Sequence, residues 1–339
     1  MKYDTKILDS SEASIKYAAS LLKNGETVGM PTETVYGLAA NAFDPIAVKK
    51  IFEAKGRPQD NPLIVHISSL DMLDGLVTEI PDNARKCAEH FWPGPLTMIM
   101  PKTDKIPLTT SAGLDTVGIR MPSNKTARAL IAAAGLPLAA PSANLSGSPS
   151  PTKAEHVYKD LNGRITCIID DGSCAVGVES TVRAFDGDAV RLLRPGFISA
   201  EELADICGKV IIDKGVTEIV SNDTVVASPG MKYKHYAPKA EITIIDVSKE
   251  TFRHYCAKNA APTDVLLIFD DNECKDIGCK TVSLGPTSEE QARRLFDVLR
   301  KLDEIGAEKV YSRCPEKTGV GLAVYNRLLR AAAFRVIKP

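Results

Sequence analysis

Short apolar runs separated by polar or proline-rich breaks fill the first two thirds of the chain. Such runs are typical of buried strands, and apolar residues spaced three and four positions apart predict amphipathic helices. Strands are expected over 27–30, 63–67, 96–100, 116–122, 136–140, 165–170 and 190–193, and helices over 11–24, 45–55, 81–91, 124–134 and 198–208. Many short strands with few long helices favour an α/β (α+β-like) fold with a twisted, mostly mixed or antiparallel sheet, and argue against a doubly wound Rossmann sheet.

The stretch 27–67 predicts a β-α-β passage that carries many polar side chains. Asp44 offers an acceptor at the helix N-cap, and Pro45 needs no amide hydrogen at the first helical position. The cations, glycine and proline of 55–58 form a helix stop signal. The strand ends and loops of this passage hold Thr34, Lys55, Arg57, Asn61 and His66. So many polar side chains in one short passage indicate a functional site.

From residue 241 the pattern changes to alternating strands and helices. Strands are expected over 241–247, 265–269, 281–284 and 309–314, and helices over 248–259, 288–305 and 320–333. This alternation predicts a small, Rossmann-like parallel α/β domain. We therefore divide the chain into a first domain over 1–212, which carries the candidate site, a linker over 213–239 and a C-terminal domain over 240–339.

The linker contains SPGMKYKHYAP, in which lysines, tyrosines and a histidine lie between two prolines. An inert spacer is usually rich in glycine and serine or simply acidic. This composition instead predicts a lid that lies over the site.

The composition limits the class of protein. At 339 residues the chain is long for one hydrophobic core, which favours two domains. The formal net charge of −1 gives no overall basic field that would point to nucleic acid, although a local basic cleft fits this balance. The eight cysteines form no CxxC pair, the chain opens with MKYDTKIL, and no apolar run approaches about 20 residues. We expect a reduced, cytoplasmic protein without a membrane segment.

The candidate chemistry lies in cations and short hydroxyl side chains. No Walker A sequence, zinc-ligand spacing or GxSxG elbow occurs, and few candidate nucleophiles have an evident base. The inventory consists of the cations Lys55, Arg57, Arg120 and Arg194 and the hydroxyls of Thr34, Ser142, Ser150 and Ser180. Such a set suits a site that binds and aligns a polyanion while two bound substrates react with one another.

Two residues keep alternative interpretations open from the residues alone. Arg120 lies inside an apolar strand and must find a partner, because an unpaired buried guanidinium is very costly. A structural ion pair and a clamp for a carboxylate or phosphate would satisfy it equally well. His66 also lies on a strand, where a satisfied core histidine and a functional histidine are both expected.

Several motifs, taken together and in order, resemble the YrdC-like threonylcarbamoyl-AMP synthases. They are PTETVYGL, KGRPxxNPLIVHI, FWPGPLT, TVGIRMP, PSANLSGSPSPT, ESTV and LRPG, and they cover most of residues 10–238. SPGMKYKHYAPKA followed by an α/β domain resembles the long, two-domain form of that family. The resemblance implies a first domain of the YrdC-like type, in which a twisted sheet surrounds a concave, positively lined cavity.

The same resemblance implies a reaction. The enzyme would be a nucleotidyltransferase that condenses L-threonine, bicarbonate or CO2 and ATP to L-threonylcarbamoyladenylate and pyrophosphate, with Mg²⁺ accompanying ATP. The product would feed the threonylcarbamoyladenosine modification of tRNA through a downstream transferase machinery. Direct contact with tRNA or other RNA is a further expectation of the same kind.

Carried onto this chain, the resemblance also implies site residues. L-Threonine would be held by Thr34, His66, Arg120, Ala140 and Ser180. ATP would be held by Arg57, Asn61, Thr116, Ser142, Asn144, Ser150, Arg194 and Tyr236, while Lys55 and Arg57 would be catalytic. No metal held by protein ligands is expected.

Two other functions stay as alternatives. A module that binds tRNA or double-stranded RNA without chemistry of its own is disfavoured by the near-zero net charge and by the lack of interleaved aromatic and basic residues. A carbamoyl-transfer enzyme with another acceptor would turn over ATP regardless of threonine.

Overall fold

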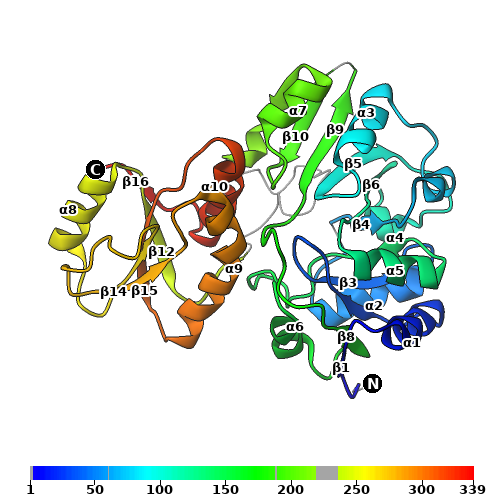
Figure 1. The fold of residues 1–339 in the computed structure, drawn as a ribbon, viewed down its shortest axis with the longest axis horizontal. Helices are drawn as coiled ribbons and strands as arrows, with labels where there is room; N and C mark the ends of the chain where they lie inside the picture. Colours follow the sequence, from blue (N-terminus) through cyan, green and yellow to red (C-terminus); the bar gives the residue numbers. More distant parts are fainter. Residues whose placement is uncertain (1–2, 60, 188, 219–235) are drawn as a thin grey trace.

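The computed structural model describes residues 3–59, 61–187, 189–218 and 236–339, which form two units, each built on one sheet (Figure 1). The first unit, within 3–218, holds an eleven-stranded sheet of order β1-β8-β2-β3-β7-β4-β6-β5-β9-β10-β11. Its strands are β1 (Lys6–Leu8), β2 (Val28–Met30), β3 (Gly37–Asn41), β4 (Ile64–His66), β5 (Leu96–Pro101), β6 (Thr116–Arg120), β7 (Leu138–Ala139), β8 (Cys167–Ile169), β9 (Thr181–Asp186), β10 (Ala189–Arg194) and β11 (Val210–Ile212). Parallel and antiparallel pairs both occur along it, which confirms the predicted mixed sheet.

Helices cover both faces of this sheet. They are α1 (Glu12–Lys23), α2 (Pro45–Lys55), α3 (Asp82–Phe91), α4 (Leu108–Ser111), α5 (Lys125–Ala134), α6 (Ala154–Leu161) and α7 (Ala200–Cys207), with 3-10 turns η1 (Leu70–Gly75) and η2 (Lys214–Val216). Helix α2 begins and ends as its sequence predicts. The Asp44 side chain accepts from the amide of Ile46, and Gly56 closes the helix with φ 60°.

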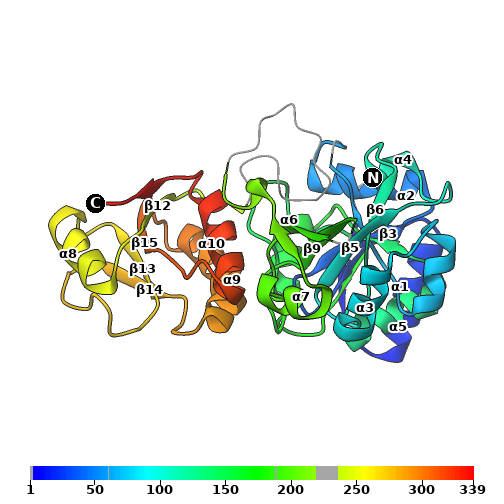
Figure 2. The same ribbon diagram turned by 90° about the horizontal axis from the view of Figure 1, so that it is seen from above.

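The second unit, within 240–339, is the predicted small parallel α/β unit. Its strands pair only in parallel, in the order β14-β13-β15-β12-β16. It consists of β12 (Glu241–Ile245), α8 (Lys249–Asn259), β13 (Val265–Ile268), β14 (Lys280–Ser283), α9 (Ser288–Glu304), β15 (Lys309–Arg313), α10 (Gly319–Ala331) and β16 (Val336–Ile337). Helices α9 and α10 face the first unit, whereas α8 covers the far side of the sheet (Figures 1 and 2).

The structure contains one strand within 27–67, β3, that the predicted β-α-β passage does not include. β3 lies between β2 and α2 and pairs antiparallel with β2, with Gly29 opposite Leu38. Strand β3 has the sequence GLAAN, which contains no β-branched or aromatic residue and therefore carries little strand preference. β4 is therefore separated from β3 by β7, and residues 31–36 form a tight reversal whose polar side chains lie at the strand ends.

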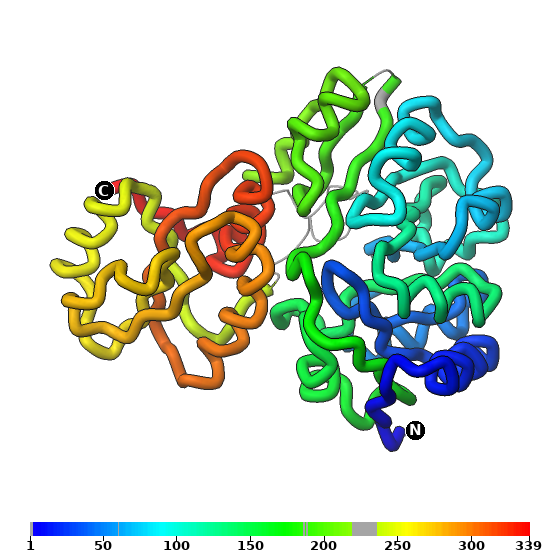
Figure 3. The backbone as a smooth tube through the Cα atoms, viewed as in Figure 1, coloured from blue at the N-terminus to red at the C-terminus, as the bar shows by residue number. Residues whose placement is uncertain are grey.

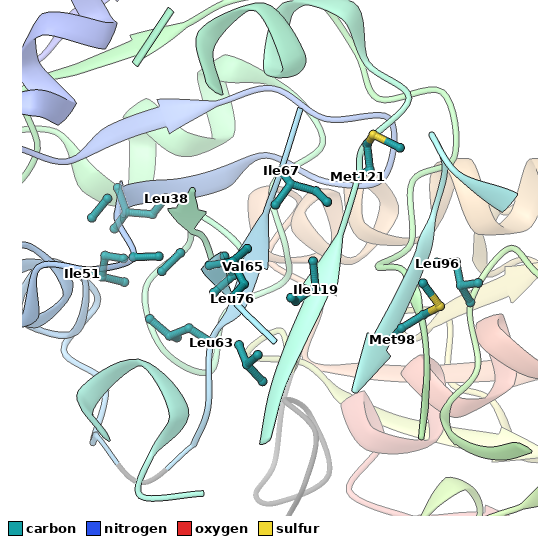
Figure 4. Packing of buried hydrophobic residues seen from close by; sticks show 14 of the residues in the cluster. Leu38, Ile51, Leu63, Val65, Ile67, Leu76, Leu96, Met98, Ile119 and Met121 are labelled. Carbon is teal, nitrogen blue, oxygen red and sulfur yellow. The ribbon is translucent and has the colours of Figure 1, made fainter. Parts of the chain in front are cut away.

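Alternation along the central strands separates the core from a second, polar face. Val65 and Ile119 belong to the main core with Leu38 and Ile51, as Figure 4 shows. His66 and Arg120 follow them in sequence and therefore point to the opposite face. Because β4 and β6 pair in register, with His66 opposite Arg120, these two side chains are neighbours on that face.

The two units share a hydrophobic core. Val35, Val176 and Val178 of the first unit pack in one cluster with apolar side chains of α9 and α10. The segment between β8 and β9 carries two of these valines past the second unit (Figure 3). Gly177 approaches the backbone of α9 closely, since a Cβ there would lie 2.3 Å from the Cα of Arg293.

Most of the predicted linker lies outside the described residues. Of 213–239, the structure describes 213–218 and 236–239, so the predicted lid and the domain boundaries stay predictions. Within the described part of the chain, every helix is too short or too polar to cross a bilayer.

We expect Gly177→Ala to destabilise the protein more than a glycine change in an open loop. Its φ of +84° costs alanine about 1–2 kcal/mol, and the clash with α9 adds about 1–3 kcal/mol of overpacking. Gly172→Ala is the matched control, because its φ of +78° is similar and nothing lies within 4 Å of a Cβ there. The free energy of unfolding in urea measures both variants, and equal losses would contradict a close docking of the two units.

Candidate active site

A cavity lies on the polar face of the central strands, at the ends of β3, β4, β6 and β10. About 810 Å³ of space lies between its walls, and part of this space is open solvent. Its walls are formed by Thr32, Thr34, Val35, Gly37, Lys55, Arg57, Asn61, Ile64, His66, Arg120, Ala140, Pro141, Ser142, Asn144, Ser146, Gly147, Ser148, Glu179, Ser180, Arg194 and Tyr236.

The structure brings nearly all of the sequence-predicted site residues into this one cavity. The exceptions are Thr116 and Ser150. Thr116 begins β6 on the same strand face as Arg120, but it is not among the lining residues. Ser150 is fully buried just behind the wall, and its hydroxyl donates to Glu179 at 2.6 Å.

A buried ion pair forms one side of the cavity. Arg120 Nη2 lies 2.8 Å from Glu33 Oε2, and Arg120 Nη1 donates to Thr34 Oγ1 at 2.8 Å. Burial pushes the pKa of Glu33 upward, but the charge of Arg120 and the amide of Ser123 outweigh it and hold the pKa below its usual value. The structural-pair interpretation of Arg120 is therefore realised, with a partner that the sequence reasoning missed.

His66 is neutral at this site. Burial and the nearby charge of Arg120 lower its pKa to about 3. Its Nδ1 is buried and has no hydrogen-bond partner among the described residues. A neutral imidazole can accept or donate one hydrogen bond there, depending on its tautomer.

The Lys55 ammonium is occupied by main-chain carbonyls. Its Nζ donates to the carbonyl oxygens of Ser142 and Asn144, the latter at 2.7 Å. Asn144 Nδ2 in turn donates to the Ser148 carbonyl at 2.9 Å. Burial, together with the charge of Arg57, lowers the pKa of Lys55 well below its ordinary value. Lys55 therefore fixes the loop after β7 that lines the cavity.

Two further arginines of the cavity wall supply positive charge. Arg194 donates from Nε and Nη2 to the Ser180 carbonyl at 3.1 and 3.0 Å, and burial lowers its pKa to about 10, so it stays cationic at neutral pH. Arg57 donates from Nη2 to the Asn61 carbonyl at 3.1 Å. With His66 neutral and Glu33 paired, cations outnumber the single lining carboxylate, Glu179, and the cavity suits an anion.

Three polar atoms in the wall have no protein partner within the described ranges. They are Arg120 Nε, His66 Nδ1 and Asn61 Oδ1, all buried. Buried polar groups are usually hydrogen-bonded, so such a cluster at a cavity is expected to be completed by a ligand. The described residues contain no cluster of three His, Cys, Asp or Glu that would hold a metal ion.

Sequence reasoning missed Glu33, Glu179 and the lining residues of 146–148. Glu33 lies between two threonines of PTET, and Glu179 opens ESTV, so both stood inside quoted motifs. The only sequence signal that pointed to a role for Glu33 was that a buried Arg120 needs a carboxylate partner. Nothing in the sequence indicated the partner of Glu179.

Comparison with known proteins gives consistent matches along the whole chain. A family described as "Telomere recombination" matches residues 20–196, and one described as "Threonylcarbamoyl-AMP synthase, C-terminal domain" matches residues 198–333. A threonylcarbamoyl-AMP synthase of Pyrococcus abyssi is 45% identical over 336 residues, 96% of each chain. One of Bacillus subtilis is 45% identical over 339 residues, 98% of this chain and 97% of the relative. The crystal structure of P. abyssi Sua5 complexed with L-threonine matches with a TM-score of 0.91 at 44% identity, over 99% of this chain and 100% of that one.

The low pKa of His66 predicts an acid-sensitive contribution to stability. Below about pH 6.5 the unfolded state binds a proton at His66 while the folded state does not until about pH 3, so stability falls as the pH falls through this window. In His66→Gln the slope of unfolding free energy against pH should become shallower by up to about 1.4 kcal/mol per pH unit.

Urea unfolding followed by the fluorescence of Trp92, the single tryptophan, measures this slope between pH 4.5 and 7.5. His90→Gln, at an exposed position of α3 outside the cavity lining, is the control. An unchanged slope in His66→Gln would show that His66 is protonated in the folded protein.

Proposed function

This chain belongs to the threonylcarbamoyl-AMP synthase family in its two-domain form, and we propose from that premise that its cavity seats L-threonine beside ATP. It is an enzyme, a nucleotidyltransferase-type synthase that forms an adenylate. The observation that carries the proposal is the gathering of Arg120, His66 and Asn61, each with an unpartnered buried atom, in one cationic cavity.

The amino-acid half of the cavity would lie over β4 and β6. The carboxylate of L-threonine would accept from Arg120, whose Nε has no other partner among the described residues. Neutral His66 would bond the amine or hydroxyl through Nδ1, because it adds no charge that would repel the ammonium. Thr34, the backbone of Ala140 and Ser180 line the same half and would complete the contacts.

The nucleotide half would lie between the loop after β7 and the end of β10. Arg57 and Arg194 would offset the charge of the triphosphate, and Asn61, Ser142, Asn144 and Tyr236 would line its path. Ser150 would act through Glu179 and not by direct contact, and Thr116 is not among the residues that line the cavity. Mg²⁺ would enter with the triphosphate as part of the substrate.

The reaction then follows from positioning. The amine of L-threonine attacks bicarbonate or CO2 and forms a carbamate, with loss of water in the case of bicarbonate. A carbamate oxygen attacks the α-phosphorus of ATP, and pyrophosphate leaves. Acceleration comes from alignment of the two substrates and from fixed positive charge along the phosphates. Lys55 would contribute by holding the loop, because its ammonium already bonds the Ser142 and Asn144 carbonyls.

The product would pass to a tRNA-modifying transferase. A carbamoyl adenylate is prone to hydrolysis, so a cover over the cavity would protect it. The predicted lid falls largely on 219–235, outside the described residues, but Tyr236 at its end lines the cavity and supports this role.

Pyrophosphate release should require ATP, L-threonine and bicarbonate together. Each omission is expected to reduce the rate to background, and the nucleotide product should be the threonylcarbamoyl adenylate. A coupled pyrophosphate assay with mass spectrometry of the product measures both. Turnover of ATP without threonine would favour a carbamoyl-transfer enzyme with another acceptor and reject the proposal.

Arg120→Gln should lower kcat/KM for L-threonine by about 100-fold, since a desolvated charge-assisted pair is worth about 3 kcal/mol. The KM for ATP should change by less than about threefold. Because Glu33 would lose its partner, the neutral double variant Glu33→Gln/Arg120→Gln is measured as well and should show the same loss. Arg85→Gln, at an exposed position of α3, is the control. An unaltered KM for threonine in both Arg120 variants would refute the clamp.

A further inference from the structure

Two arginines of the second unit reach buried groups of the first. Arg300 of α9 donates to both carboxylate oxygens of Asp160, at 3.0 and 2.8 Å, and to the Pro149 carbonyl at 2.6 Å. Arg327 of α10 donates from Nε to Glu179 Oε2 at 2.7 Å. Arg327 is fully buried, so its charge lies within the contact between the two units, out of reach of solvent.

Glu179 connects Arg327 to the wall of the cavity. One of its carboxylate oxygens accepts from Arg327, and the other accepts from the Ser150 hydroxyl at 2.6 Å. Burial raises the pKa of Glu179, but Arg327 and then Arg194 outweigh burial and keep the carboxyl ionised. A negative charge therefore lies in the cavity wall near Arg194, which the proposed function assigns to the triphosphate, and Arg327 is its direct counter-ion.

The segment between Asn144 and Ser150 is held by the second unit from two sides. Arg300 binds the Pro149 carbonyl, and Arg327 reaches Ser150 through Glu179. Ser146, Gly147 and Ser148, which precede these anchors, line the cavity. The second unit thus fixes the shape of the loop on the nucleotide side.

We propose that Arg327 is a positioning residue for ATP, through which the second unit prepares the nucleotide half of the cavity. It neutralises Glu179 and keeps Ser150 and the 146–150 loop in place, without touching the substrate itself. The inference rests on the proposed function for the identity of the nucleotide. It assigns the second unit a part in substrate binding besides carrying the linker.

A role limited to joining the two units predicts something different. Other ion pairs cross the same boundary without reaching the cavity. Lys159 pairs with Glu304 at 3.0 Å with both side chains more than half exposed. If Arg327 only joined the units, its loss would lower stability and affect both substrates alike.

The test uses the full-length chain and three variants. Arg327→Met leaves Glu179 unpaired, Arg327→Met/Glu179→Gln removes both charges, and Glu304→Gln breaks the exposed pair as the control. The Kd for ATP by calorimetry and the KM values for ATP and L-threonine are measured for each, and thermal unfolding checks that each variant is folded.

Arg327→Met should raise the Kd and KM for ATP at least tenfold, while the KM for L-threonine changes less than twofold. The double variant should recover ATP binding to within about threefold of the wild type, because no carboxylate charge then faces the phosphates. Glu304→Gln should behave as the wild type.

Equal effects on both substrates, or a double variant no better than Arg327→Met, would overturn the inference. The calorimetric Kd for ATP distinguishes a failure of this inference from a failure of the proposed function. If the wild type bound ATP but formed no threonylcarbamoyl adenylate, the proposed function would fail, whereas the coupling of Arg327 to ATP would still be decided by the measured Kd values.

Discussion

The ion pair between Arg120 and Glu33 ties together the two segments that build the amino-acid side of the cavity. Arg120 ends a central strand, and Glu33 lies in the reversal between β2 and β3. Neither charge could stay buried alone, so each segment needs the other in place. The backbone of 33–34 is also bonded to Val176 and Gly177, which pass the second unit. The pair therefore lies where the sheet, the cavity and the contact between the units meet.

The other buried charged groups of the cavity also have hydrogen-bond partners within the protein. Lys55 is occupied by carbonyl oxygens, Arg194 by the Ser180 carbonyl, and Glu179 by Arg327 and Ser150. Three buried atoms of the cavity's lining residues, Arg120 Nε, His66 Nδ1 and Asn61 Oδ1, have no protein partner among the described residues. The charged groups of the wall are held by protein partners, and fixed positive charge of this kind is what catalysis by alignment requires.

The sequence predicts the elements better than their contacts. The caps of α2 and the parallel strands of the second unit followed from Asp44, Pro45, Gly56 and the alternating pattern, because these signals are local. β3 escaped prediction because its small residues carry no strand preference, and its pairing is set by the tertiary fold. The sequence motifs contain most of the cavity residues. The structural role of Lys55, however, depends on the carbonyls of Ser142 and Asn144, which lie 87 and 89 positions away. The partner of Glu179 lies 148 positions away, and no spacing rule reaches it.

The buried contact between Glu179 and Arg327 has a consequence for how such chains can diverge. A hybrid that joined the first unit of this protein to the second unit of a relative with a neutral residue in place of Arg327 would place an uncompensated anion in the floor of its own binding site. The two positions must therefore be exchanged as a set. The presence of both Glu179 and Arg327 at these positions would indicate that a first unit and a second unit can be combined.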